Sequence, residues 1–240
     1  GYTMVYGIIR LINFAHGDFI MVGGYAIIFT TPLVTALHLP VWLAVIPAIV
    51  ICALVGMGTE IIAYRPVRRN GTAMTALITA IAMSLMLENL AQAIPQIGPN
   101  PKVSSQIFPA SGIRFGSVTM EWATILTILI GGAVMLVLYA FTQKTKLGRA
   151  MRCVSEDKEA ATLMGINVNR TILLTFGIGS GLSAVAALMY MAQYPKIYTT
   201  MGSLLGLKAF VAAVLGGIGI LPGAMVGGIV IGLVESFTTT

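Results

Sequence analysis

Long apolar runs alternate with short polar gaps along most of this chain. The runs that reach membrane-spanning length cover residues 19–37, 41–63, 73–94, 122–142 and 171–194. Each lies close to the roughly 20 apolar residues that a helix needs to cross the hydrocarbon core of a bilayer. The runs lack the strict alternation of barrel strands, and a helix satisfies its own backbone hydrogen bonds in lipid. The pattern therefore predicts an all-α fold, a polytopic membrane helical bundle.

A glycine-rich apolar region follows at 203–237, where Pro222 and Gly223 interrupt it. It is compatible with two short helices joined by a tight turn at membrane depth, or with a turn near one surface. Glycines four residues apart form a flat strip on a helix and let two helices approach closely. We expect such packing, with or without a role in transport, at four pairs: Gly177 and Gly181, Gly219 and Gly223, Gly223 and Gly227, and Gly228 and Gly232.

The composition agrees with a membrane protein, since 57% of the residues are hydrophobic and only 9% are charged. A soluble globular domain has far more charge than this. The chain begins at Gly1 rather than Met, and it stops at Thr240 directly after an apolar run. We therefore expect one transmembrane domain, 1–240, that is truncated at both ends.

The net charge of +6 sits in the gaps between apolar runs and not in a separate basic domain, so we expect no nucleic-acid partner. Cytoplasmic loops of membrane proteins retain Lys and Arg. When the predicted spans alternate, one face collects Arg10, Arg65, Arg68, Arg69, Lys144, Lys146, Arg149, Arg152, Lys158 and Arg170, against Lys102, Arg114 and Lys196 on the other. This asymmetry places 10–18, 64–72 and 143–170 in the cytoplasm, and 38–40, 95–121 and 195–202 outside.

The longest cytoplasmic stretch, 143–170, contains the signals of a short helix. Ser155 is a good N-cap, and Glu156 and Asp157 would follow in the first turn, where the helix dipole favours negative charge. Gly165 suits the left-handed residue that ends a helix. The pattern predicts a helix of about ten residues across the inner surface, because three- and four-residue spacings give it one apolar face. That face contains Ala160, Leu163 and Met164.

The segment from Glu159 through Ala160, Ala161 and Leu163 to Gly165 resembles the E-A-A-x-x-x-G coupling loop of ABC importer permeases. The resemblance implies that this loop docks on an ATPase subunit. Glu159 would pair with a basic residue there, the alanines would allow close approach, and Gly165 would turn the chain toward the next span.

A second resemblance narrows the family. The opening GYTMVYGIIRLINFAHGD, the stretch LGRAMRC at 147–153 and the glycine-rich 215–235 are similar to the H-type subunit of branched-chain amino acid permeases, over essentially the whole chain. Asp18 stands where that family commonly has Glu. Relatives that carry urea or short amides share much of the pattern, so a urea or short-amide permease is the alternative.

The resemblance implies a multi-pass subunit in the cytoplasmic (inner) membrane of a bacterium or archaeon. Its partners would be a second permease subunit of the M-type, two ATPase subunits and a periplasmic substrate-binding protein. We expect no cofactor on this chain, with ATP used by the partner subunits, and the sequence contains no G-x-x-x-x-G-K-[ST] phosphate loop of its own.

Ionisable groups in a membrane need a partner, an aqueous path or a surface. Glu88 and Asn89 belong to a polar stripe late in the 73–94 span, which either lines the translocation pathway or serves as a structural contact. Asn13 and His16 likewise line the pathway or stabilise a turn, with Asp18 capping the 19–37 helix.

Two further charges have simpler interpretations. Lys208 either extends to the surface or pairs with Glu88, and Glu60 pairs with the nearby Arg65, Arg68 or Arg69.

Two other classes of function explain less of the chain. An ion-coupled secondary carrier would account for the glycine-rich end and Glu88, but it gives no purpose to the 155–165 helix. A membrane-embedded enzyme needs convergent catalytic groups, and His16 with Asp18 has no third partner that the sequence can place. Cys52 and Cys153 have no metal-ligand neighbours, so we expect neither a disulfide nor a metal site. The sequence favours a transport subunit over an enzyme.

Overall fold

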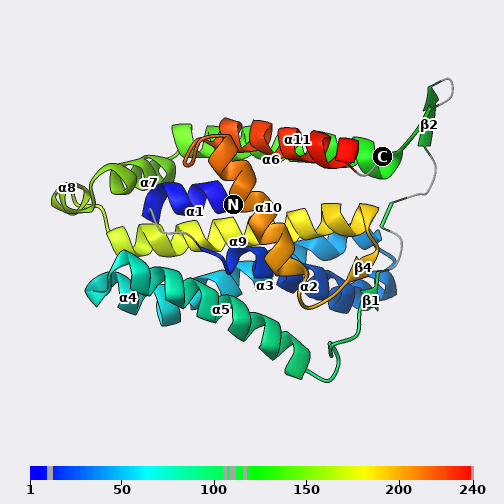
Figure 1. Cartoon of the computed structure of the whole chain (residues 1–240), viewed down its shortest axis with the longest axis horizontal. Coiled ribbons are helices and arrows are strands. Elements are labelled where there is room, and N and C mark those ends of the chain that lie inside the picture. The colour runs from blue at the N-terminus through cyan, green and yellow to red at the C-terminus, as the bar shows by residue number, and fades with distance from the viewer. Residues whose placement is uncertain (10–12, 105–106, 109–111, 116–117, 239–240) are drawn as a thin grey trace.

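A computed structural model describes residues 1–9, 13–104, 107–108, 112–115 and 118–238 as a bundle of long helices (Figure 1). The predicted position of Arg10 at the cytoplasmic face lies outside the described residues. The helices in chain order are α1 (Tyr2–Ile9), α2 (His16–Ala36), α3 (Val45–Thr59), α4 (Arg65–Asn70), α5 (Ala73–Ala93), α6 (Trp122–Lys144), α7 (Lys146–Glu156), α8 (Lys158–Leu163), α9 (Val168–Gln193), α10 (Met201–Leu215) and α11 (Leu221–Thr238).

Three shorter features complete the chain. A 3-10 turn, η1 (Val41–Ala44), leads into α3, and a π-helical turn, η2 (Glu60–Tyr64), joins α3 to α4 without a break. Strand β1 (Lys102–Val103) pairs with β4 (Lys196–Ile197), and β2 (Gly112–Phe115) forms an antiparallel hairpin with β3 (Val118–Glu121).

The predicted membrane spans are confirmed. Within the described ranges, six helices are long and apolar enough to cross a membrane, namely His16–Ala36, Val41–Arg68, Met74–Ala93, Trp122–Lys144, Val168–Gln193 and Leu221–Thr238. The first five match the predicted runs to within a few residues. The ambiguous 203–237 region is two helices, α10 and α11, and its turn uses Gly217 and Gly219 at positive φ, where a side chain would be strained.

Helix α9 forms the centre of the bundle, and small residues let its neighbours approach it. A Cβ at Gly177 would lie 3.1 Å from Met57 of α3, and one at Gly23 of α2 would lie 2.8 Å from the Ala184 backbone. Gly223 and Gly227 similarly hold α11 against the end of α10. Gly228 and Gly232 pack against no other segment of the described chain, since a Cβ at either position would meet no atom within 4 Å.

The connections that the charge pattern predicts to be cytoplasmic and those that it predicts to be outside lie at opposite ends of the bundle. In Figure 1, α4, α7 and α8 gather at one end, whereas β1, β2 and β4 lie at the opposite end. The basic segments 64–72 and 143–170 therefore share one face. The predicted position at this face is wrong for Asn13, His16 and Asp18, because these side chains lie inside the bundle with 0–5% of their surface exposed.

Candidate functional site

The inner-face loop contains a short helix, α8, whose start differs from the prediction. The chain at Asp157 is extended (φ −149°, ψ 119°), which separates α7 from α8. The Asp157 carboxylate accepts hydrogen bonds from the backbone N–H groups of Glu159 (2.8 Å) and Ala160 (3.0 Å). Asp157 is thus the N-cap. Ser155 lies within α7 and donates to the Arg152 carbonyl at 2.6 Å, so the predicted cap at Ser155 and the ten-residue length are wrong.

The predicted end of this helix is confirmed. Gly165 adopts φ 80°, the left-handed conformation that glycine favours. The N–H of Gly165 donates to the Thr162 carbonyl, and that of Ile166 donates to the Ala161 carbonyl, both at 3.0 Å. Asn167 then caps α9 by accepting from the N–H of Arg170. Both ends of α8 are therefore fixed by local hydrogen bonds.

The side chains of α8 divide into an exposed set and one anchor. Glu159 and Ala160 are exposed, and Leu163 and the adjoining Met164 are 88% and 83% exposed, unusual values for large apolar side chains. Ala161 is buried in the same apolar cluster as Tyr64, Met151 and Ile172. Only the first alanine of the motif therefore faces outward, while the second packs against the bundle.

A buried ion network lies at the same end of the bundle. Glu60 accepts from Arg68 at 2.5 Å and from Arg65 at 3.1 Å, and its side chain is completely buried. Arg68 also approaches Asn169, two residues beyond the α9 cap, at 3.5 Å. The predicted ion pairs of Glu60 are confirmed for Arg65 and Arg68, while the Arg69 side chain lies outside the description. The network joins the π-turn η2 to the start of α9.

A second group of polar contacts lies deeper in the bundle. Tyr64, at the end of η2, donates to Asn13 at 2.7 Å, and His16 Nε2 lies 3.4 Å from Ser183 Oγ near the middle of α9. Asn13 Nδ2 and His16 Nδ1 have no hydrogen-bond partner within the described part of the chain. These contacts link the inner network to the centre of the membrane span.

Two serine–carboxylate contacts join three membrane helices. Ser84 of α5 donates to Asp18 of α2 at 2.5 Å, and Ser203 of α10 donates to Glu88 of α5. Asp18 does not cap α2, because Ala15 holds the N-cap position. Ser84 and Glu88 are four residues apart and therefore share one face of α5.

Neither Asn89 nor Lys208 fits the predicted arrangement completely. Asn89 is exposed beside Glu88, and its amide donates to the Leu85 carbonyl of its own helix at 2.7 Å. Lys208 pairs with Glu235 at 2.5 Å and not with Glu88. Sequence reasoning missed Ser84, Ser203 and Tyr64. The spacing of Ser84 from Glu88 is a signal that could have found the first.

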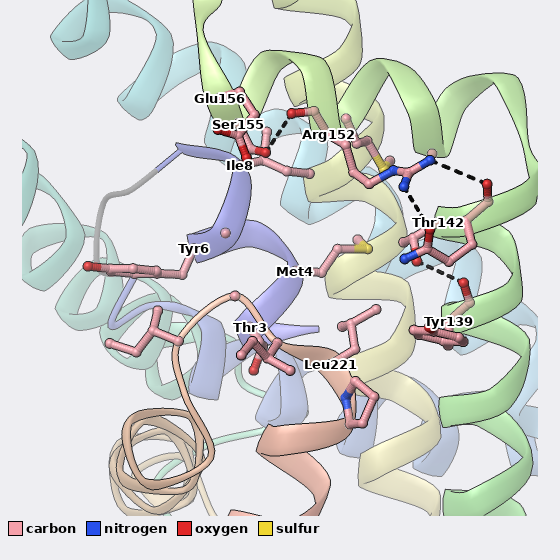
Figure 2. A pocket seen from close by; sticks show the side chains of 18 residues that line it. Thr3, Met4, Tyr6, Ile8, Tyr139, Thr142, Arg152, Ser155, Glu156 and Leu221 are labelled. Atoms are coloured by element: carbon pink, nitrogen blue, oxygen red, sulfur yellow. Dashed lines mark hydrogen bonds between the residues drawn. The ribbon is translucent and has the colours of Figure 1, made fainter.

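A cavity of about 580 Å³ opens between α1, α6, α7 and the turn before α11 (Figure 2). Met4 and Leu221 contribute apolar walls, and Glu156 and Arg152 contribute charge. Figure 2 shows Arg152 extending from α7 to α6, where it donates to the Gln143 side chain at 2.7 Å. In the described ranges, no three His, Cys, Asp or Glu side chains gather as they would around a metal ion.

Comparison with known proteins identifies a family that covers the whole chain. A family model described as the permease component of branched-chain amino acid transport systems matches residues 1–240. The permease BraD of the high-affinity branched-chain amino acid transport system of Pseudomonas aeruginosa is 40% identical over 99% of this chain and 79% of its own length. The corresponding LivH of Escherichia coli is 41% identical over 100% of this chain and 80% of its own length. A probable LivH of Methanocaldococcus jannaschii is 28% identical over 100% of this chain and 75% of its own length. No solved structure matches.

Proposed function

We infer the function of this chain from its family, since it belongs to the permease components of branched-chain amino acid transport systems. It is a membrane-spanning subunit of an ABC importer, a transport subunit and not an enzyme. The proposed substrates are branched-chain amino acids, and family membership over the whole chain is the observation that carries this conclusion. Six apolar helices support a multi-pass protein, and we place it in the cytoplasmic membrane of a bacterium or archaeon.

The proposed assembly contains four kinds of component. This chain pairs with a second permease subunit of the M-type, two ATPase subunits bind and hydrolyse ATP, and a periplasmic binding protein delivers the substrate. In this arrangement the chain itself binds no cofactor. The membrane-crossing helices leave only short segments outside the membrane in the described residues, and this supports placing ATP hydrolysis on the partner subunits.

The ATPase contact is assigned to α8. Leu163 and Met164 form an exposed apolar surface beside the charged Glu159, and this combination suits insertion of a short helix into a groove with a basic rim. Glu159, Ala160 and Leu163 make the contact in this proposal. Ala161 anchors the helix to the bundle, and Gly165 returns the chain to α9.

The route of the mechanical signal follows from the anchors of α8. A rigid helix that tilts with the ATPase moves Ala161 and the start of α9 together, because the loop between them is fixed by the caps described above. Arg68 bridges Asn169 to Glu60, and Tyr64 bridges the same turn to Asn13. The π-turn between these bridges is the kind of irregular helix found at functional sites. ATP-driven motion thus reaches the middle of the membrane through hydrogen-bonded contacts.

The translocation pathway is assigned to the polar residues at membrane depth. Asn13, His16, Glu88 and Asn89 lie in helices or turns that are otherwise apolar. The exposed side chain of Asn89 supports a face covered by protein or water, because an amide gains nothing from lipid contact. Glu88 is 9% exposed and bonds to Ser203, so it meets the pathway only when α5 and α10 separate.

Charge reversal at Glu159 tests the proposed ATPase contact. We expect Glu159→Lys to lose co-purification with the ATPase subunits of its transport system and to lose uptake in proteoliposomes, with normal yield of the permease. Glu156→Lys is the matched control, since it makes the same charge change on an exposed residue of the preceding helix. Retained association and uptake in Glu159→Lys would show that the docking assignment is wrong.

The substrate assignment has its own test. The binding protein of the same transport system should retain leucine, isoleucine or valine, and reconstituted uptake should require ATP. Retention of urea alone would make the chain a urea permease. Uptake that persists without ATP and stops when an ion gradient is dissipated would make it a secondary carrier.

A further inference from the structure

Helices α10 and α11 share an ion pair that faces outward from the described chain. Lys208 Nζ lies 2.5 Å from Glu235 Oε1, and the two side chains are 40% and 50% exposed. The helices around them are apolar, with no other Asp, Glu, Lys or Arg in 201–215 or 221–238. Charges in such helices are costly against lipid and face a bundle interior or a water-filled path. The exposed surface around this pair is therefore a contact with water or with polar protein.

The pair lies at membrane depth, away from both ends of the bundle. Helix α10 starts at Met201, shortly after β4, and β4 lies at the end of the bundle that carries the outer connections (Figure 1). Lys208 is seven residues from this start, about 10 Å along a helix. Gly202 and Gly206, which precede Lys208 on α10, pack against Asp18 and Gly17, so the pair lies close in depth to the polar contacts around His16.

The surroundings of the pair are aliphatic. Leu204 and Val211 lie four residues before and three after Lys208, so they share its face of α10, and they are 52% and 41% exposed. Val234, next to Glu235, is 57% exposed. One cation, one anion and an apolar surface thus lie side by side, as in a site for an amphipathic ligand with a dipolar head group.

The pair is not needed to close the α10–α11 hairpin. The two helices already meet at glycine positions, where a Cβ on Gly227 would collide with the Ala212 carbonyl and one on Gly223 with the Gly216 carbonyl. These backbone contacts lie at the turn and fix the hairpin at its inner end. An exchange of partners by the ion pair therefore leaves the hairpin closed.

We propose that Lys208 and Glu235 form a transient subsite for the zwitterionic head group of the transported amino acid. The Lys208 ammonium binds the substrate carboxylate, the Glu235 carboxylate binds the substrate ammonium, and the branched side chain rests on Leu204 and Val211. The exchange replaces one internal ion pair by two pairs with the substrate, so no charge is left without a partner at membrane depth. This assignment rests on the proposed function, because it takes an amino acid as the solute.

Charge variants in the complete reconstituted transporter test the subsite. Lys208→Met and Glu235→Gln should each lower uptake of radiolabelled leucine about tenfold, the scale of losing one partner of a partly exposed charge pair. Binding-protein-stimulated ATP hydrolysis should stay within about twofold of the parent, because α8 is untouched. Lys208→Arg keeps the cation and should retain most of the uptake.

The double variant Lys208→Glu with Glu235→Lys distinguishes a substrate site from an ion pair that is only structural. It rebuilds the ion pair with reversed polarity. If the pair only joins α10 to α11, or only joins this chain to another subunit through its charges, this variant should assemble and transport normally. The proposal expects assembly to recover and leucine uptake to remain low, since each head-group charge now meets its like. Recovery of uptake overturns the proposal. If the exchanged variant does not assemble, Lys208→Gln with Glu235→Gln decides, and normal uptake there overturns the proposal as well.

Failure of the proposed function has a different signature. A parent protein that shows no binding-protein-stimulated ATP hydrolysis is not an importer subunit of this kind. Normal hydrolysis and uptake in the parent, with normal uptake in both neutral variants, leaves the function intact and removes only the subsite.

Discussion

The inner-face loop around α8 and the buried polar contacts of the bundle hold their functional groups by opposite means. In α8 the backbone is fixed by Asp157 at one end and Gly165 at the other, and the side chains remain exposed. In the bundle, Glu60 is fixed by Arg65 and Arg68 of the following turns and Asp18 by Ser84 of α5, and both carboxylates have no exposed surface. The exposed groups of the loop suit the proposed contact with the ATPase, whereas the bundle contacts determine how the helices of this chain sit against one another.

This difference separates stability from function. Exposed charges contribute little to folding, whereas a buried charge that loses its partner costs several kcal/mol. Substitutions in the buried contacts should destabilise the permease itself. Substitutions in α8 should leave the permease stable and weaken its coupling to the ATPase.

The largest effect is expected at Glu60, because it compensates two arginines. Glu60→Gln should destabilise the permease by about 3–5 kcal/mol, the usual cost of removing one member of a buried ion pair. The measurement is the thermal unfolding midpoint of the purified transporter in detergent. Arg65→Gln is the matched control, since the Arg65 side chain is 32% exposed and Glu60 keeps Arg68. Equal unfolding midpoints for Glu60→Gln and the parent would mean that the network is not part of the framework of the bundle.

A smaller but clear loss is expected at the crossing of α2 and α10. A Cβ on Gly17 would lie 2.7 Å from Gly206 Cα and would also collide with the Gly202 carbonyl, both backbone atoms. Gly17→Ala should therefore cost about 1–3 kcal/mol, as overpacking does. It should also disturb the adjacent Asp18–Ser84 contact.

The control for this crossing is Gly58→Ala on α3, where a Cβ would meet nothing within 4 Å of the described chain. An alanine there should be neutral or stabilising, because glycine is unfavourable inside a helix. If both variants unfold at the same temperature, α2 and α10 are not in close contact in the membrane.

Hydropathy alone predicted the spans well because burial in lipid is a property of each segment. A run of apolar residues can be identified without knowing which segments it contacts. Local chemistry predicted the end of α8 for the same reason, since Gly165 suits a left-handed residue wherever the helix lies. It failed at the start, because Ser155 and Asp157 are both good caps and only the extended backbone at Asp157 decides between them.

The serine partners of Glu88 and Asp18 could not be predicted because they depend on tertiary packing. Ser203 and Glu88 are 115 residues apart, and Ser84 and Asp18 are 66 apart. The packing of α5 against α2 and α10 brings these residues together, and hydropathy carries no information about which helices pack. The same limit explains Lys208, whose nearest anion along the fold is Glu235 on the next helix and not Glu88.

The smallest effect on stability, with a measurable effect on function, is expected at Asp157. Asp157→Ala removes the acceptor for two backbone N–H groups at the start of α8, and an N-cap contributes about 1 kcal/mol to its helix. A six-residue helix has little other support, so the lost free energy should lower the population of the helical conformation of α8 that binds the ATPase. We expect affinity for the ATPase subunit to fall about fivefold, the equivalent of that free energy. The unfolding midpoint of the permease should not change, because the buried Ala161 and the α9 cap at Asn167 remain.

Asp157→Asn keeps an oxygen acceptor at the same place and should restore the affinity. If the asparagine variant binds as weakly as the alanine variant, the role of Asp157 is its charge at the docking surface, and α8 does not depend on its cap.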